Sequence, residues 1–151
     1  MIELTYREGA LSPERRSSLV VRLTEVLMTW EGVPDTEFFR DATWVQIHER
    51  PGWALNRAGG PVGETTYLVA ATVPEGALSA RRKAGLIEEV TQAVLAADGG
   101  SDDGYRVWVH VHEIPDGNWG ADGKPVMFGE LRAAAARARA GAAAPDGPGR
   151  E

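Results

Sequence analysis

The sequence contains no cysteine, no long apolar run and no concentration of basic residues. The absence of cysteine excludes a disulfide framework, a thiol nucleophile and a cysteine metal site. No apolar run approaches the ~20 residues of a membrane-spanning helix, and no signal peptide is visible at the start. The net charge is −6 with scattered basic residues, which argues against a nucleic-acid-binding surface. These absences favour a cytoplasmic protein without nucleic-acid or membrane partners.

Two sequence segments that each occur twice indicate an internal duplication. EGALS stands at residues 8–12 and again at 75–79, and WVQIHERP at 44–51 is matched by WVHVHEIP at 108–115. The first pair is shifted by 67 residues (75 − 8) and the second by 64 (108 − 44), in the same order. A repeated structural unit explains both matches. We therefore expect one domain over residues 1–128, built from units 1–63 and 64–128.

Each unit is expected to begin with a strand followed by a helix. Apolar and polar residues alternate over 2–7, whereas 67–73 is more uniformly apolar, as in a buried strand. Ser12 is a suitable N-cap and Pro13 suits the first helical position. Apolar residues then recur at helical spacing in both units: Leu19, Val20, Leu23, Val26, Leu27 and Trp30 in the first, and Leu86, Ile87, Val90, Ala93, Val94 and Ala97 in the second.

A second strand is expected to close each unit, at residues 43–48 and 106–113. Helices of this length between strands favour parallel crossovers. The sequence therefore predicts an α/β fold in which duplicated β-α-β units form a four-stranded sheet with two helices on one face. Residues 129–151 differ, because LRAAAARARA favours a short helix and the remainder resembles a flexible tail.

Alternation along the closing strands separates two faces of the predicted sheet. The helix-facing set is Val107, Val109 and Val111, and the opposite set is Arg106, Trp108, His110 and His112, with Trp44, Gln46 and His48 in the first unit. A face bearing tryptophan and histidine is not expected to lie bare in water. We therefore expect an oligomer or a pocket on this side.

The segment 106–124, which contains HEIPDGNWGADGK, resembles the tautomerase superfamily, whose type member is 4-oxalocrotonate tautomerase. The resemblance extends over both units, about residues 1–128. It implies strand-helix-strand units and, for members with two units per chain, a homotrimer. It also implies chemistry without a cofactor, in which an amino-terminal proline transfers protons and arginines hold the carboxylate of a small oxo acid or enol. An aromatic residue in the last loop packs over the substrate.

The proline and the turn arginines of the family have no direct match. The proline slot lies nine residues before Gly9, so Met1 stands immediately after it. Ala10 and Ala77 occupy the arginine positions that follow the turn glycines. Two explanations remain open: a proline encoded directly before Met1, or a member without the catalytic proline. In the second case the primary amine of Met1 would be a weaker base.

The remaining family positions fall on the second unit. Trp108 stands in the slot of the strand arginine, and His110 stands where dehalogenase members carry a catalytic tyrosine. Trp119 matches the loop aromatic. Arg106 could replace the lost anion contact or form a salt bridge at the rim. His110 could act as an acid or base, with an ordinary hydrogen-bonding role as the alternative.

Two classes of function follow from these residues. The first is a tautomerase-like isomerase that moves a proton between carbon and oxygen of a small, less polar and aromatic 2-oxo acid. The second is a non-catalytic trimer of the same fold that acts as a scaffold or binds a small ligand. His48 and His112 are repeat-related, which indicates a shared structural role. An H-x-H pair without other placed ligands indicates no metal site.

Overall fold

A four-stranded mixed sheet forms the centre of the protein. The computed structural model describes residues 1–61, 63–100 and 102–143, and the predicted tail at 144–151 lies outside the described residues. The strands are β1 (Ile2–Arg7), β2 (Val45–Arg50), β5 (Tyr67–Pro74) and β6 (Val107–Ile114), in the order β2-β1-β5-β6. β1 runs parallel to β2 and β5 runs parallel to β6, while β1 and β5 meet antiparallel at the centre. The predicted fold is confirmed.

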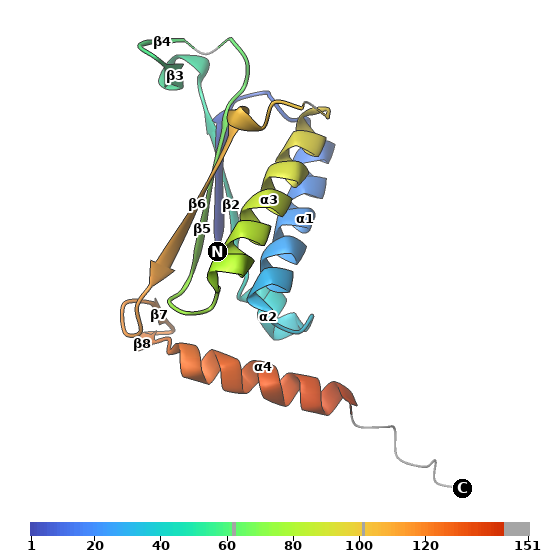
Figure 1. Cartoon of the computed structure of the whole chain (residues 1–151), viewed down its shortest axis with the longest axis vertical. Helices are drawn as coiled ribbons and strands as arrows, with labels where there is room; N and C mark the ends of the chain where they lie inside the picture. Colours follow the sequence, from blue (N-terminus) through green and yellow to red (C-terminus); the bar gives the residue numbers. More distant parts are fainter. Residues whose placement is uncertain (62, 101, 144–151) are drawn as a thin grey trace, which may run out of the picture.

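Two long helices cover one face of this sheet (Figure 1). They are α1 (Pro13–Glu31) and α3 (Ala80–Asp98), each of 19 residues. Their N-caps are Ser12 and Ser79, and the C-cap glycines, Gly32 and Gly99, adopt left-handed conformations with φ of 69° and 118°. Only glycine adopts this conformation at little cost. Both helices begin and end 67 residues apart (80 − 13 and 98 − 31), as the duplication predicts.

The core lies between the helices and the sheet. Its fully buried members are mainly the predicted apolar faces: Ile2, Leu4, Tyr6, Leu23, Leu27, Val69, Ala71, Val73, Leu86, Val90 and Val94. The predicted helix faces are confirmed for these residues, although Ile87 lies at the edge and is 39% exposed. Val107, Val109 and Val111 face the helices as expected. Each fully buried aliphatic side chain contributes about 1.5–3 kcal/mol.

The opposite face of the sheet carries no helix within the described residues (Figure 1). Trp44 and Trp108 are 62% and 65% exposed there. An apolar surface of this kind suits contact with a partner rather than water. None of the helices in the described ranges is long and apolar enough to cross a bilayer.

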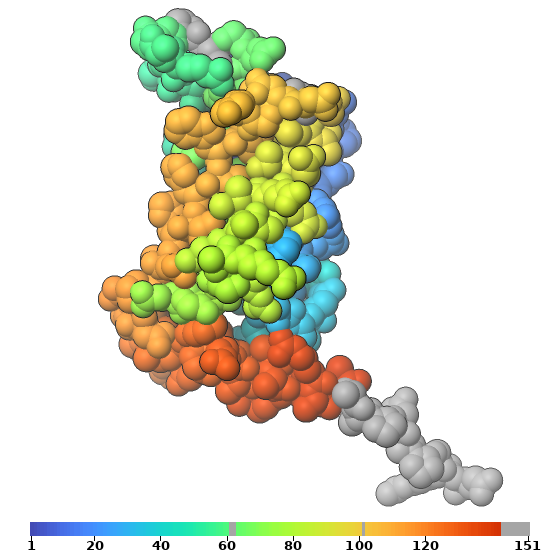
Figure 2. All heavy atoms as spheres, viewed as in Figure 1, coloured from blue at the N-terminus to red at the C-terminus, as the bar shows by residue number. Residues whose placement is uncertain are grey.

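Helix α4 (Phe128–Ala143) crosses one end of the two-layer sandwich (Figures 1 and 2). It packs through Ala135 on Met28 of α1 and Phe39 of the short helix α2 (Glu37–Asp41). The guanidinium of Arg139 donates to the carbonyl oxygen of Gly32. Figure 2 shows an opening between α4 and the turn before α3. Short elements complete the chain: η1 (Gly52–Ala54), β3 (Asn56–Arg57), β4 (Gly60–Pro61), η2 (Gly104–Arg106), β7 (Gly120–Ala121) and β8 (Lys124–Pro125).

Candidate functional site

The amine of Met1 lies at the end of the sheet where β1 begins. It donates a hydrogen bond of 2.9 Å to the carbonyl oxygen of Thr72, and the Thr72 N–H donates to the Met1 carbonyl at 2.8 Å. On the other side, the N–H of Ile2 donates to the carbonyl of Trp44 at 2.8 Å. The first residue is thus held between β2 and β5 as an extension of β1. Its nitrogen therefore has a defined direction.

The carboxyl of Glu31, the last residue of α1, interacts with this amine. Burial lowers the pKa of the Met1 amine, and the nearby carboxylates of Glu31 and Glu3 offset part of this effect. Burial raises the pKa of the Glu31 carboxyl, and the charge of the amine offsets part of that effect. Both shifts favour the neutral forms. The pair therefore combines an amine that can accept a proton with an acid that can donate one.

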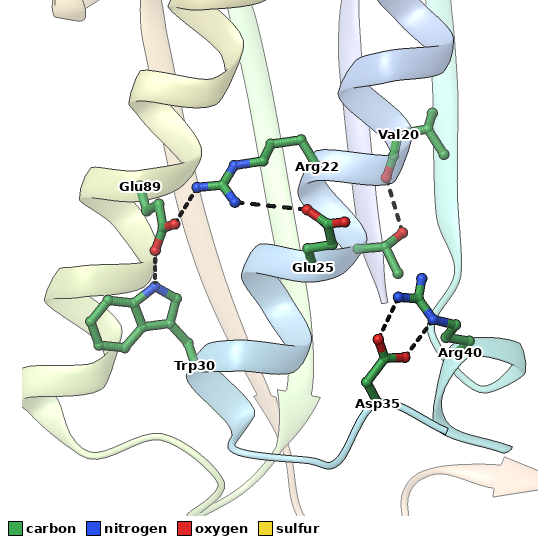
Figure 3. Close-up of polar contacts among 8 residues, drawn as sticks. Val20, Arg22, Glu25, Trp30, Asp35, Arg40 and Glu89 are labelled. Atoms are coloured by element: carbon green, nitrogen blue, oxygen red, sulfur yellow. Dashed lines mark hydrogen bonds and ion pairs between the residues drawn. The ribbon is translucent and has the colours of Figure 1, made fainter. Parts of the chain in front are cut away.

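The position of Glu31 runs against the local preferences of a helix. Negative charge is disfavoured at a helix C-terminus, and the last turn of α1 contains no basic residue. Trp30 nevertheless fixes this turn, because its indole lies against Gly85 of α3 and its Nε1–H donates to Glu89 at 2.8 Å (Figure 3). Glu89 also accepts from Arg22 at 2.5 Å. A residue that opposes the charge preference of its own helix, and that tertiary contacts nevertheless fix in place, is typical of a functional site. Glu31 was not predicted as a site residue, although an acid directly before a C-cap glycine is a visible signal in the sequence.

The second unit places Asp98 where the first unit has Glu31 (31 + 67 = 98), and the two carboxyls have different surroundings. The hydroxyl of Tyr67 donates to Asp98 at 2.5 Å, and Arg106 forms a buried ion pair with it. Burial alone would raise the pKa of Asp98, but hydrogen bonds from Tyr67 and Arg106 outweigh it and hold the pKa below its usual value. Tyr67 also fills the place that corresponds to the residue before Met1 (67 − 67 = 0). Of the two repeat-related carboxyls, Glu31 has a raised pKa and lies beside an amine, whereas Asp98 has a lowered pKa and lies in an ion pair. Such a difference in pKa between two carboxyls indicates a chemical role for Glu31 and a structural role for Asp98.

The prediction that Arg106 shares the sheet face of His110 is wrong. Arg106 lies in η2, one residue before β6, and is 6% exposed. Its guanidinium also donates to the carbonyl oxygen of Thr65 at 3.0 Å. Strand alternation does not extend into a 3₁₀ turn, so the side chain turns toward α3 and Asp98. Arg106 therefore holds the end of the molecule opposite Met1.

Trp108 and His110 lie on the helix-free face as predicted, but not beside the amine of the same chain. In the sheet register, Thr72 pairs with His112, Ala70 with His110 and Leu68 with Trp108. β6 is two strands from β1, a separation of about 10 Å. His110 and Trp108 lie successively further along β6 from the row of Met1. The rings of His110 and His112 meet edge-on with centroids 5.9 Å apart.

Trp119 lies at the same end of the sheet as Met1, in the loop that follows β6. It is half-buried, and its carbonyl accepts from the N–H of Val126 at 2.7 Å across the β7–β8 hairpin. His48 lies 3.3 Å from a carboxylate oxygen of Glu3. In residues 1–61, 63–100 and 102–143 there is no group of three or more His, Asp or Glu placed to hold a metal ion.

An open cavity of about 440 Å³ lies elsewhere, between the first half of α1 and the edge strand β2. It is lined by Arg16, Ser17, Val20, Ile47 and Glu49. Arg16 and Glu49 form an ion pair of 3.2 Å across it. This cavity is distant in the fold from Glu31, which ends the same helix, and it contains no amine.

Comparisons with known proteins agree with the architecture. The family described as "Tautomerase enzyme" matches residues 68–129, which is the second unit. Among solved structures, N1, a member of the cis-3-chloroacrylic acid dehalogenase (cis-CaaD) family, is 26% identical, with a TM-score of 0.73 and coverage of 87% of both chains. A native fused 4-OT is 18% identical with a TM-score of 0.71, covering 87% of this chain and 96% of its own. The Q0 fused 4-OT, described as a wild-type symmetric trimer, is 24% identical with a TM-score of 0.68, covering 89% of this chain and 97% of its own. No curated protein matches the chain.

Residues 68–129 therefore match the tautomerase family, and the whole chain has the fold of proteins in which two 4-OT units are fused.

Proposed function

We propose that this protein is a cofactor-independent isomerase that catalyses keto–enol proton transfer on a small aromatic 2-oxo acid. The observation that carries this proposal is the pair formed by the amine at the start of β1 and the carboxyl of Glu31. Their pKa values are shifted in opposite directions by burial, and both shifts favour the uncharged forms.

The proposed reaction needs one base and one acid, and the pair supplies both. In ketonisation, the neutral amine takes the proton of the enol hydroxyl while the Glu31 carboxylic acid gives its proton to the adjacent carbon. In this step the O–H bonds of the enol and of Glu31 break, an N–H and a C–H bond form, and the enol C=C becomes the C=O of the ketone, without oxidation or reduction. The ammonium and the carboxylate that result exchange a proton and restore the starting pair. A positioned acid or base of this kind contributes about 10²–10⁴-fold to the rate.

The nature of the substrate follows from what surrounds the pair. Ala10 and Ala77 stand where the resemblance implies arginines, which favours a substrate with little charge. Trp119, in the loop at the same end of the sheet, suits an aromatic group. Phenylenolpyruvate combines an enol, one carboxylate and a phenyl ring, and is the first substrate to test.

We further propose that the helix-free sheet face joins three copies of the chain. The exposed Trp44 and Trp108 on that face, and the similarity to a fused 4-OT that forms a symmetric trimer, support this arrangement. In such an assembly His110 and Trp108 would face a neighbouring copy. Gel filtration at micromolar concentration is expected to give three times the chain mass, and a mass of one chain would contradict the trimer.

The missing arginines also favour a second candidate, a non-catalytic trimer that binds a small ligand. The two candidates differ in the reactivity of the amine. A low-pKa amine is expected to be labelled rapidly by 3-bromopyruvate, with the added mass on the first peptide. The intact mass of the native protein, measured beforehand, identifies the residue that carries this amine. No labelling and no turnover of phenylenolpyruvate would favour the non-catalytic trimer.

A further inference from the structure

We propose that Arg82 and Arg139 form the carboxylate-binding element of this site, and that its ligands are monocarboxylates. This proposal rests on the proposed function for the identity of the reacting pair, but it makes a separate claim about binding. Neither arginine occupies a position at which the resemblance to tautomerases implies one. Arg139 also lies beyond residues 68–129, the part of the chain that matches the family.

The two guanidinium groups meet at the end of α1. Arg82 is in the first turn of α3, and its Nη1 lies 3.5 Å from the carbonyl oxygen of Glu31. A Cβ added at Gly32 would lie 3.3 Å from the other terminal nitrogen of Arg82. Arg139, from α4, donates to the carbonyl oxygen of Gly32. Residues 57 positions apart (139 − 82) thus converge beside the residue whose carboxyl faces the amine.

Both guanidinium groups remain available to an external anion. Each side chain is exposed, and its hydrogen bonds go to neutral backbone carbonyls. Within the part of the chain that the structure describes, neither forms an ion pair with a carboxylate. By contrast, Lys83, the next residue after Arg82, forms a 2.6 Å ion pair with Glu113. A contact at 3.5 Å is a weak hydrogen bond. A charged carboxylate, which accepts stronger and often bidentate bonds from arginine, can replace it.

The placement also determines how a ligand would lie. A carboxylate between Arg82 and Arg139 would lie at the C-terminus of α1, next to the backbone of Glu31 and Gly32. The site therefore suits one carboxylate attached to an uncharged body, as in a 2-oxo monoacid. Dicarboxylates are expected to bind more weakly.

A purely structural role makes different predictions. Cations near a helix C-terminus stabilise the helix by interacting with its last carbonyls. If Arg82 and Arg139 served α1 alone, their removal would lower the melting temperature and leave the affinity for carboxylates unchanged. Measurements must therefore separate affinity, turnover and stability.

The chain offers matched controls for both arginines. Arg81 and Arg137 are exposed neighbours on the same helices, so R81A and R137A remove the same charge near the same place. We would compare R82A, R139A and R82K with these controls. For each variant, NMR titration gives the Kd for phenylpyruvate, and kinetics give kcat and KM for phenylenolpyruvate and for its uncharged methyl ester. Thermal melts report stability.

We expect R82A and R139A each to weaken phenylpyruvate binding and to raise KM for phenylenolpyruvate by about tenfold, the effect of losing a charge-assisted hydrogen bond. kcat should change little, R82K should restore part of the affinity, and the methyl ester and both controls should be unaffected. Turnover with unchanged KM and Kd in R82A and R139A would overturn the inference and leave the proposed function intact. Arginine-dependent binding without turnover would support the inference and refute the proposed function. Loss of melting temperature alone, or no binding of phenylpyruvate by the wild-type protein, would also overturn the inference.

Discussion

Gly85→Ala tests the contact that positions the last turn of α1. Gly85 lies inside α3, where alanine is normally more favourable than glycine by about 1 kcal/mol. In this protein a Cβ at residue 85 would lie 2.1 Å from Cη2, 2.3 Å from Cζ2 and 2.6 Å from Cζ3 of Trp30. Carbon atoms pack at about 3.5–4.0 Å, so the indole would have to move by more than one ångström.

The expected magnitude combines three effects. Moving the indole breaks the 2.8 Å hydrogen bond from Trp30 to the carboxylate of Glu89, shown in Figure 3. Hydrogen bonds to charged groups contribute about 1.5–3 kcal/mol. Forced repacking typically costs about 1–3 kcal/mol, and the helix preference for alanine offsets about 1 kcal/mol. These effects combine to a loss of about 1.5–5 kcal/mol in the free energy of unfolding of G85A. Turnover should also fall, because Glu31 follows Trp30 directly.

The assay is denaturant unfolding of wild type, G85A, W30A and the double variant at one fixed protein concentration. In the W30A background the ring is absent, so G85A is expected to stabilise the protein by about 1 kcal/mol. The sign of the effect should therefore reverse between the two backgrounds. Stabilisation by G85A in the wild-type background would refute the packing of Trp30 on Gly85.

Two further predictions concern the repeat-related carboxyls. R106M leaves the half-buried carboxylate of Asp98 with the hydrogen bond from Tyr67 and should lower the free energy of unfolding by about 1–3 kcal/mol, measured by denaturant titration. A loss below about 0.5 kcal/mol would contradict a stabilising ion pair. E31Q should stabilise the protein at neutral pH, because a carboxyl with a raised pKa in the folded state makes wild-type stability fall as pH rises above the unfolded value of about 4.3. The difference between E31Q and wild type should vanish below that pH, and a constant difference at all pH values would exclude ionisation as its cause.

Much of the fold could be predicted because its signals are local and occur twice. The Ser-Pro start of α1 and the glycines that end α1 and α3 are capping signals readable from sequence. Alternation over β6 identified both its core-facing valines and its helix-free face. These features depend on neighbours along the chain, which the sequence contains.

The predictions that were wrong or missing concern residues whose surroundings are formed by elements distant in the sequence. Arg106 was placed on the wrong face because the 3₁₀ turn η2, and not the strand, sets its direction, and because its partner Asp98 lies on another element. The carboxyl of Glu31 has a raised pKa because the fold buries it beside the start of β1, and this burial is not visible in the local sequence. The helix at α4 was expected from its alanines, but its docking site is set by Met28 and Phe39. His110 was placed on the correct face, and its partners depend on whether a second copy covers that face.

The central claim is that the amine at the start of β1 and the carboxyl of Glu31 form a proton-transfer pair. The most direct test is the ketonisation of phenylenolpyruvate by protein whose first residue has been established by intact mass, comparing wild type with E31Q and E25Q. Glu25 is an exposed residue of the same helix, so E25Q makes the same charge change away from the amine. We predict turnover above the buffer rate in wild type and E25Q, and a loss of kcat of about 10²–10⁴-fold in folded E31Q. Equal kcat in E31Q and wild type would contradict the claim.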